Sequence, residues 1–547
     1  MKLLRILPVP FLLLSTAYGG LVQSVNPQVP LEYALVKAEV VEMFEHGYQQ
    51  YKNYAWGYDN LAPLTRTYNQ GRNGWGATIV DAMGTMSIMA GESIVLDSWL
   101  KEAINYTAHI DFSQSKQENE RVSIFETTIR YLGGMLSTYE LTNEEYPELL
   151  GQSVKLADKL AYGWVGSNNI PYGWLNFTNN EPQVTVTNIA EAGTLTLEWE
   201  VLSKFTGNKT YEDLVLRSVN QIAKLEMPLP GLAPVWIDPT TSSFSGGYIT
   251  WGGGGDSYFE YLIKHARLSN TDDSIYADSW ATAIDSSITH LLKTSTVGNH
   301  TYLADYDSDG LIRHTSSHLA CFHGGNFLLG GKLLDNQTIV DVGLALVDGC
   351  WNTYASTATG IGPESFGFIS EDGSFTGPGD VISDEQLEFY NKTGFYPRST
   401  PYVHRPEVLE SNFYAWRVTG DTKYLDRAKS AVHSLNTYIR VPSGFAGLWN
   451  VNQPGGGLID DTESFWFAET LKYLYLTFDD PTRFSLDEYV FTTEAQLFKA
   501  PPPKEKYGSG TLRKPTGTFR LTEGPAGPAY SDSPGARMAH LDHRIRD

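Results

Sequence analysis

Helix-sized segments that carry an acidic residue or a histidine near their start recur along this chain. The step from Glu126 to Glu191 is 65 residues, the step on to Asp256 is again 65, and the next step is 62. A near-constant step of this size predicts a repeated unit of structure. The seven segments surround Asp81, Glu126, Glu191, Asp256, His318, Glu407 and Glu463.

These segments are apolar on almost every side, which is typical of helices buried inside a protein. Residues 208–225 and 421–439 lie between such segments and are amphipathic, as outer helices are. A repeated pair of one inner and one outer helix predicts an all-α fold, a closed (α/α)7 toroid. Seven segments favour seven pairs, although six would also fit. No linker rich in Pro, Gly or Ser divides residues 30–499, so we expect one domain there.

The two ends of the chain differ from this domain. Residues 488–498 are rich in β-forming side chains, and this segment could plug one mouth of the toroid. Residues 501–547 are rich in Pro and Gly and predict a disordered tail. At the other end, two basic residues, a short apolar run and Ala17-Tyr18-Gly19 predict a signal peptide over residues 1–19. An uncleaved membrane anchor is the competing interpretation.

The signal peptide places the chain in the secretory pathway, and we expect a secreted, extracellular protein. In that compartment Asn-x-Ser/Thr sequons can be glycosylated. Cys321 and Cys350 are the two cysteines of the chain, and in an oxidising compartment they most simply pair. Two buried free thiols would be the alternative. The six sequons are at Asn105, Asn176, Asn208, Asn299, Asn336 and Asn391.

The charge of the chain restricts its partners. Forty Lys and Arg stand against 63 Asp and Glu, which gives a net charge of −23. Such a surface repels phosphate groups, so nucleic acids and anionic membranes are excluded as partners and neutral substrates are favoured. We expect no stable membrane insertion after signal cleavage, and a monomer.

A ring of inner helices would gather its acids around one central cavity. Any one acid has a simpler explanation, since the helix dipole favours acids in a first turn, and Glu126 could pair with Arg130 one turn on. Several acids beside Phe125, Tyr258 and Phe465 indicate more, because sugar rings bind against aromatic faces and polar groups. Glycoside hydrolysis needs one acid for the leaving oxygen and one base for water.

The sequence resembles glycoside hydrolase family 47, the class I α-1,2-mannosidases, across roughly residues 30–499. The blocks that carry the resemblance include FETTIRYLGGMLS, EAGTLTLEW, GDSYFEYLIK, HLACFHGG, RPEVLESNFYAWRVTGD, DTESFWFAETLKYLYLTF and YVFTTEA. The resemblance implies a seven-pair toroid whose end is plugged by a C-terminal β-hairpin, in agreement with the repeat. It is closest to the secreted fungal members.

The resemblance also implies catalytic roles. Glu126 matches the candidate general acid, Glu407 matches the candidate general base, and Asp256 matches a third acid that is a proton relay or an alternative acid. The family inverts configuration at the reacting carbon. It also binds Ca²⁺, for which Thr493 matches the one direct protein ligand. Three further acids would hold calcium-bound waters: Glu410, Glu469 and Glu494.

Other matched positions would bind substrate. Phe465 would stack on the sugar, while Arg405, His318 and Glu191 would line the pocket and hold hydroxyls. Gly254 stands where a group with narrower specificity has Arg, so it would leave space for several mannose branches. It could instead be there for its backbone conformation. Cys321 and Cys350 match the segments that carry the family's disulfide.

We therefore expect a calcium-dependent, inverting exo-α-1,2-mannosidase that trims high-mannose N-glycans on glycoproteins from nine mannoses toward five. A catalytically weak, mannose-binding quality-control factor of the same fold is the alternative from another class. A toroidal glycosidase of different specificity would require the block matches to be coincidental.

Overall fold

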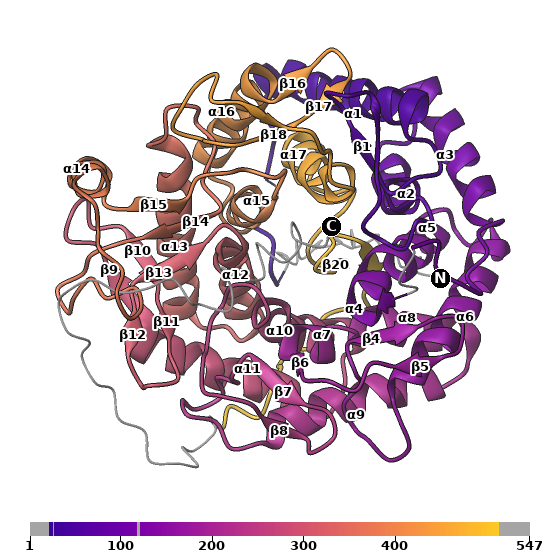
Figure 1. The fold of residues 1–547 in the computed structure, drawn as a ribbon, viewed down its shortest axis with the longest axis horizontal. Coiled ribbons are helices and arrows are strands. Elements are labelled where there is room, and N and C mark those ends of the chain that lie inside the picture. Colours follow the sequence, from indigo (N-terminus) through magenta and orange to yellow (C-terminus); the bar gives the residue numbers. More distant parts are fainter. Residues whose placement is uncertain (1–20, 26, 118–120, 513–547) are drawn as a thin grey trace, which may run out of the picture.

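The computed structural model describes residues 21–25, 27–117 and 121–512, and the predicted signal peptide lies outside these ranges. Within them the chain alternates between outer and inner helices around a ring, so the predicted α/α toroid is confirmed (Figure 1). The outer helices are α1 (Ala34–Tyr54), α3 (Ile94–Thr107), α6 (Pro147–Leu160), α9 (Thr210–Lys224), α11 (Ile275–Ser286), α13 (Gln337–Ala355) and α16 (Lys423–Tyr438). The inner helices are α2 (Ala77–Ile88), α5 (Gly133–Leu141), α8 (Thr196–Thr206), α10 (Asp256–Ser269), α12 (His323–Leu333), α15 (Glu407–Thr419) and α17 (Leu471–Phe478).

The first and last helices close the ring. Helix α1 packs against α17, and the backbone N–H of Thr462 donates to the carbonyl of Leu61. Near the described N-terminus, Val22 donates its backbone N–H to Asp487, 465 residues further on. The two ends of the domain are therefore joined by direct contacts.

Inner helices pack closely because small residues face their neighbours. In α12, a side chain on Gly330 would collide with the indole ring of Trp280 on α11. Outer helices such as α9 bury one face only, which includes Val215, Val219 and Ile222. This division between wholly buried and half-buried helices is the one that the sequence pattern predicts.

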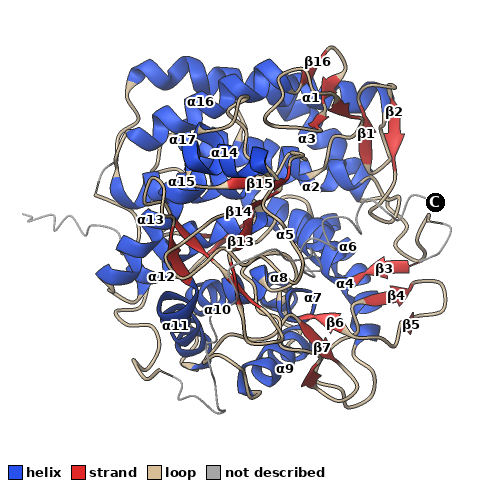
Figure 2. Cartoon of the chain, turned by 60° about the vertical axis from the view of Figure 1, so that its left-hand side comes forward, coloured by secondary structure: helices blue, strands red, loops and turns tan. Residues whose placement is uncertain are grey.

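Short antiparallel sheets connect the helices, and several project from the same side of the molecule (Figure 2). Two three-stranded sheets precede acid-bearing helices: β3 (Arg121–Ser123), β4 (Trp174–Asn176) and β5 (Glu181–Pro182), and β6 (Thr187–Asn188), β7 (Trp236–Asp238) and β8 (Ser243–Phe244). A third consists of β13 (Thr315–Ser317), β14 (Ser365–Gly367) and β15 (Tyr396–Ser399), with α14 (Asp384–Thr393) inserted before β15. The two-stranded pairs are β1 (Asn60–Ala62) with β2 (Thr67–Asn69), β9 (Leu292–Thr294) with β10 (Thr301–Leu303), β11 (Asp305–Tyr306) with β12 (Ile312–Arg313), β16 (Arg440–Val441) with β17 (Gly444–Phe445), and β18 (Gly447–Leu448) with β19 (Leu458–Ile459).

The β-like segment near the C-terminus forms a hairpin of β20 (Tyr489–Phe491) and β21 (Leu497–Lys499). Strand β20 contacts α10, β21 contacts α5, and Figure 1 shows β20 near the centre of the ring. The turn of this hairpin therefore reaches the space enclosed by the inner helices.

The first part of the expected disordered tail, residues 501–512, makes direct contacts with the helical domain. Residues 501–512 pack on the outside of the ring, where Tyr507 is 5% exposed and donates its hydroxyl to Asn270. Arg267 donates to the carbonyl of Pro501. A buried aromatic ring and a buried guanidinium hold this segment despite its prolines. The rest of the predicted tail lies outside the described residues.

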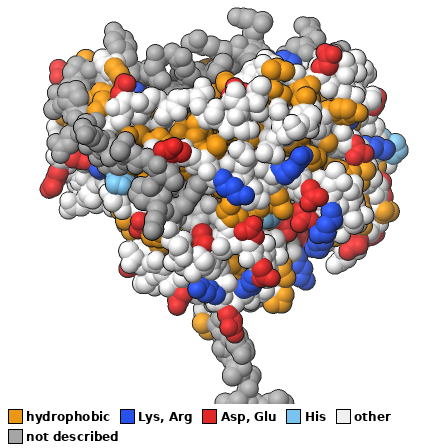
Figure 3. All heavy atoms as spheres, turned by 90° about the horizontal axis from the view of Figure 1, so that it is seen from below, with side chains coloured by type: hydrophobic (Ala, Val, Ile, Leu, Met, Phe, Trp, Pro, Cys, Tyr) orange, Lys and Arg blue, Asp and Glu red, His pale blue; other side chains and the backbone are white. Residues whose placement is uncertain are grey.

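The predicted disulfide between Cys321 and Cys350 is present and joins the start of the α12 segment to α13. Five of the six sequon asparagines are exposed, and Asn176 is half-exposed. None of the described helices is both long and apolar enough to span a membrane. On the face shown in Figure 3, acidic and basic side chains are interspersed among uncharged ones.

Candidate active site

A cavity of about 540 Å³ opens at the centre of the ring, and five of the acids at the starts of inner-helix segments line it. Its floor contains the most deeply buried groups, and its rim is formed by exposed residues between β5 and β6. The predicted convergence of acids is therefore observed. The five are Glu126, Glu191, Asp256, Glu407 and Glu463.

Strands deliver two of these acids to the cavity. Strand β3 leads into the short helix α4 (Ile124–Thr127), and the Ser123 hydroxyl accepts the backbone N–H of Glu126. Strand β6 leads in the same way into α7 (Ile189–Gly193), where Asn188 caps the N–H of Glu191. Each cap satisfies an N–H that a helix start leaves without a partner, and so fixes the acid two residues inside the helix.

Two inner helices are wound differently where they face the cavity. Residues Thr128–Leu132 and Trp466–Thr470 form π-helical turns, and these turns contain Arg130 and Glu469. A π-turn is rare and is found mostly at functional sites, because the wider turn changes the direction of its side chains.

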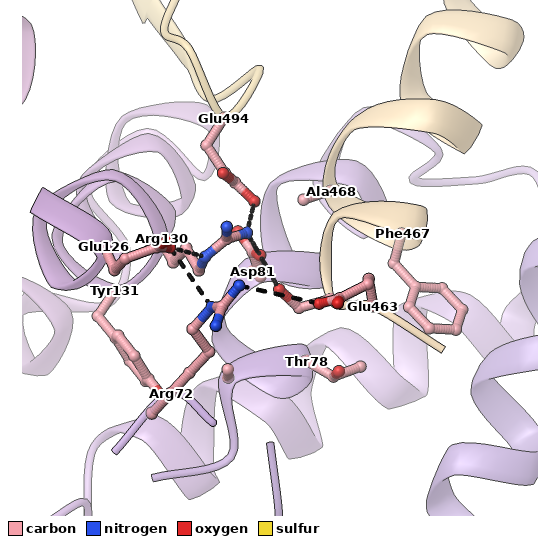
Figure 4. Close-up of polar contacts among 12 residues, drawn as sticks. Arg72, Thr78, Asp81, Glu126, Arg130, Tyr131, Glu463, Phe467, Ala468 and Glu494 are labelled. Carbon is pink, nitrogen blue, oxygen red and sulfur yellow. Dashed lines mark hydrogen bonds and ion pairs between the residues drawn. The ribbon is translucent and has the colours of Figure 1, made fainter. Parts of the chain in front are cut away.

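Glu126 lies in a buried cluster of charges (Figure 4). Its carboxylate is 2.8 Å from Nε of Arg130 and 3.4 Å from Nε of Arg72. Arg130 also contacts Glu494 and lies 3.5 Å from Asp81. Burial acts to raise the pKa of Glu126, but the two guanidinium groups outweigh it and lower that pKa to about 2. Glu126 is therefore a carboxylate at any physiological pH.

Asp256 has the opposite electrostatic environment. Burial raises the pKa of Asp256 to about 7, and the nearby carboxylates of Glu260 and Glu407 act in the same direction. The N–H of Ser257, 2.8 Å from Oδ1, opposes the shift without cancelling it. In mildly acidic solution this carboxyl group keeps its proton.

Glu407 is paired with a histidine. Oε2 of Glu407 is 2.6 Å from Nδ1 of His318, and the other ring nitrogen is 2.8 Å from the Tyr354 hydroxyl. Burial favours a higher pKa for Glu407, but His318 reverses this and holds that pKa below its usual value. His318 is 2% exposed and lies behind Glu407, whereas we expected it to line the pocket and hold sugar hydroxyls.

Thr493 stands at the turn of the β20–β21 hairpin and lines the cavity. Its backbone N–H donates to the hydroxyl of Tyr261, which in turn donates to Glu198. Among the described residues, neither the hydroxyl nor the carbonyl oxygen of Thr493 has a hydrogen-bond partner. Two residues further on, Ala495 has a φ of 52° and Lys472 donates to its carbonyl, so the turn is held firmly.

The residues around this turn suit a hard cation. Burial, and then repulsion from neighbouring carboxylates, raise the pKa of Glu410, Glu469 and Glu494 well above the usual value, so this region carries an excess of acidic groups. No three His, Cys, Asp or Glu side chains in the described ranges converge as a direct ligand set. The two free oxygens of Thr493, with the side chains of Glu410, Glu469 and Glu494 lining the same cavity, fit Ca²⁺, which takes oxygen ligands and waters.

The predicted substrate-binding residues also line the cavity, except His318. The Arg130 guanidinium lies 5.4 Å from the ring centre of Phe465, and Arg405 pairs with Glu364 at 2.7 Å. Gly254 has a φ of 88°, in the left-handed region that favours glycine, and its carbonyl accepts the N–H of Ala190. The left-handed backbone conformation alone can therefore explain why this position is a glycine, whether or not the missing side chain leaves space for substrate.

Some residues of the site were not singled out from the sequence. Glu260 lies one helical turn after Asp256, on the same face of α10, so the four-residue spacing could have indicated it. Arg72 comes from the first repeat and meets Glu126 only through the fold. Asp81, one of the seven residues that mark the repeat, lies 3.5 Å from Arg130 in the same cluster. Trp174 and Trp236, in the sheets beside α4 and α7, also line the cavity.

A toroid of helices whose central cavity brings together an acid with a raised pKa and a carboxylate with a lowered pKa has the two groups that glycoside hydrolysis requires. The sequence profile of Glycosyl hydrolase family 47 matches residues 43–500. This chain therefore belongs to glycosyl hydrolase family 47.

Named relatives agree with this assignment. A mannosyl-oligosaccharide alpha-1,2-mannosidase 1B from Emericella nidulans is 42% identical over 486 residues, which cover 85% of this chain and 93% of that protein. The protein of the same name from Aspergillus oryzae is 42% identical, with coverage of 83% and 90%. The solved alpha-1,2-mannosidase from Trichoderma reesei superposes with a TM-score of 0.81 at 33% identity, and covers 86% of this chain and 99% of its own.

Proposed function

We propose that this protein is an inverting exo-α-1,2-mannosidase that trims high-mannose N-glycans in the secretory pathway or outside the cell. One observation carries the proposal: a single cavity holds a carboxyl group with a pKa of about 7, Asp256, and a carboxylate with a lowered pKa, Glu407. Hydrolysis of a glycosidic bond needs this combination of acid and base. The names of the relatives supply the substrate class.

In this mechanism Asp256 protonates the leaving oxygen of the glycosidic bond. Glu407, kept ionised and oriented by His318, takes a proton from the water that attacks the sugar from the opposite face. Glu126 remains ionised between Arg130 and Arg72, so its role is to orient the substrate or a bridging water and to balance charge. Phe465 gives the terminal sugar an apolar face.

Thr493 would hold a calcium ion through its hydroxyl and carbonyl oxygens, with waters held by Glu410, Glu469 and Glu494. When bound, the ion supplies a fixed positive charge that orients sugar hydroxyls and neutralises the buried acids. The hairpin turn, fixed by Lys472 and Tyr261, positions these oxygens at the cavity floor.

The decisive experiment is to incubate the protein with a nine-mannose glycan, with calcium or with a chelator, and to follow the masses of the products. We expect stepwise loss of four mannoses, ending mainly at five, and no loss with the chelator. The Glu407→Gln variant is the matched control. A glycan-binding factor without catalysis would bind the glycan and leave its mass unchanged.

The breadth of trimming depends on Gly254. Its position at the cavity wall supports removal of several branches, because no side chain narrows the wall there. At a φ of 88°, however, Gly254→Arg would also strain the loop by roughly 1–2 kcal/mol. A product ladder that slows at selected steps supports the role in specificity. A variant that is slowed equally at every step shows that strain alone explains the glycine.

A further inference from the structure

The sheets that lead into Glu126 and Glu191 are built alike. In the first, Ser123 caps the acid-bearing helix and pairs across the sheet with Trp174. In the second, Asn188 caps the helix and pairs with Trp236. The two tryptophans therefore occupy the same position relative to an acid in consecutive repeats.

The backbone bonds repeat as well. The N–H of the first helical residue donates to the carbonyl just before each tryptophan: Ile124 to Gly173 at 3.0 Å, and Ile189 to Val235 at 2.8 Å. Each tryptophan carbonyl then accepts, at 2.8 Å, the N–H of the residue that directly follows the third strand. The sheets thus hold the two backbones firmly at equivalent places beside the cavity.

The indole side chains of the two tryptophans are not fully buried in the hydrophobic core. Trp174 and Trp236 both line the cavity and are half-exposed, and in the described ranges neither indole N–H donates a hydrogen bond. Arg121 stacks on Trp174 with its guanidinium 4.6 Å from the ring centre, which orients that ring. Partly exposed, oriented indoles at the rim of a cavity are unusual unless they contact a ligand.

The position of the rings relative to the acids defines what they would touch. A side chain on Gly173, next to Trp174, would collide with the Glu191 carboxylate, so this strand runs directly against an acid of the site. The buried acids Glu410, Glu469 and Glu494 mark the cavity floor, and the exposed segment from Gln183 to Val186 marks its rim between the two sheets. The indoles thus flank the entrance, away from the floor where the terminal sugar would sit.

We propose that Trp174 and Trp236 form a paired aromatic platform that binds the sugars of a branched glycan beyond the mannose being removed. This inference deepens the proposed function and rests on it. Apolar faces of pyranose rings would lie on the indoles, and binding energy from these remote sugars would help to hold the reacting bond in place. A disaccharide reaches less of the platform than a nine-mannose glycan does.

The test compares two substrates, an α-1,2-linked mannose disaccharide and a nine-mannose glycan. Trp174→Ala and Trp236→Ala should each lower kcat/KM on the glycan by about tenfold, and the double variant by about 100-fold if the rings act independently. The loss on the disaccharide should be at least about fivefold smaller. Trp449→Ala is the matched control, since Trp449 is 55% exposed and does not line the cavity, and its kcat/KM on the glycan should stay at the wild-type value.

Equal losses on both substrates, or no loss on the glycan, would overturn the platform. Calorimetric binding of the glycan to each tryptophan variant in a Glu407→Gln background separates this outcome from failure of the proposed function. If the wild type cleaves neither substrate but the tryptophan variants bind the glycan about tenfold more weakly, the platform stands and the hydrolase proposal fails. Trp174→Phe and Trp236→Phe, which keep an aromatic face, replace any alanine variant that does not fold.

Discussion

Replacing Asp256 by asparagine should remove the basic limb of the pH–rate profile. With a pKa of about 7, Asp256 is about 99% protonated at pH 5, whereas at its ordinary value of 3.8 it would be only about 6% protonated. The wild-type kcat/KM should therefore hold through mildly acidic pH and fall above about pH 7. An amide cannot give up a proton as a carboxylic acid does, so the Asp256→Asn variant should lose about 10²–10⁴-fold in kcat/KM and show no basic limb.

Glu126→Gln is the matched control because it removes a carboxylate of the same cavity whose pKa is lowered, whereas the pKa of Asp256 is raised. Arg130 and Arg72 keep Glu126 ionised above about pH 2, so the control should lose activity while its basic limb stays in place. Arg130 would still be paired with Glu494 and Asp81. The assay is kcat/KM on the α-1,2-linked disaccharide between about pH 4 and 8.5 in saturating calcium. A basic limb that persists in Asp256→Asn and vanishes in Glu126→Gln would identify Glu126 as the proton donor and refute the reasoning.

Four further outcomes are expected. Glu407→Gln should lower kcat by about 10²–10⁴-fold while calorimetry still detects glycan binding; activity within about threefold of wild type would remove Glu407 from the mechanism. Chelation should lower the Tm, since an ion bound only to the folded state stabilises it. In the metal-free protein the free energy of unfolding should fall as pH rises from about 4 to about 8. Burial raises the folded-state pKa of Glu198 to about 8 and that of Asp256 to about 7, so over this range the folded state binds more protons than the unfolded state does. A Tm that does not change over this range would contradict the prediction. Replacing Cys321 and Cys350 by Ser should lower the free energy of unfolding by about 3–4 kcal/mol in denaturant titrations, since the bond closes a loop of 29 residues; a change below about 1 kcal/mol would count against it.

The fold and the position of the cavity could be predicted because they depend on periodic features of the sequence. The 65-residue step places Glu126, Glu191 and Asp256 at equivalent points of successive inner helices, so their convergence follows from closing the ring. The segment 488–498 was predicted as β structure because Val, Phe and Thr are enriched in strands, and the hairpin confirms it.

The roles of individual acids could not be predicted in this way. The pKa of Glu126 depends on Arg72, which comes from a different repeat, and that of Glu407 depends on His318, 89 residues earlier. The position of His318 behind the base follows from the packing of α15 against the start of α12, for which a single sequence has no local signal. Composition predicted a disordered tail from residue 501, and composition does not record the burial of Tyr507 or its hydrogen bond to Asn270.

Closure of the ring also has a consequence for the order in which the protein can become active during synthesis. Glu126 and Arg130 leave the ribosome early, but Glu494, which pairs with Arg130, the turn with Thr493 and helix α17 belong to the last tenth of the domain. A nascent or truncated chain can pair its early helices, but it cannot complete the charge cluster or seal α1 against α17. We therefore expect catalytic activity only from molecules that have been translated through to their final hairpin.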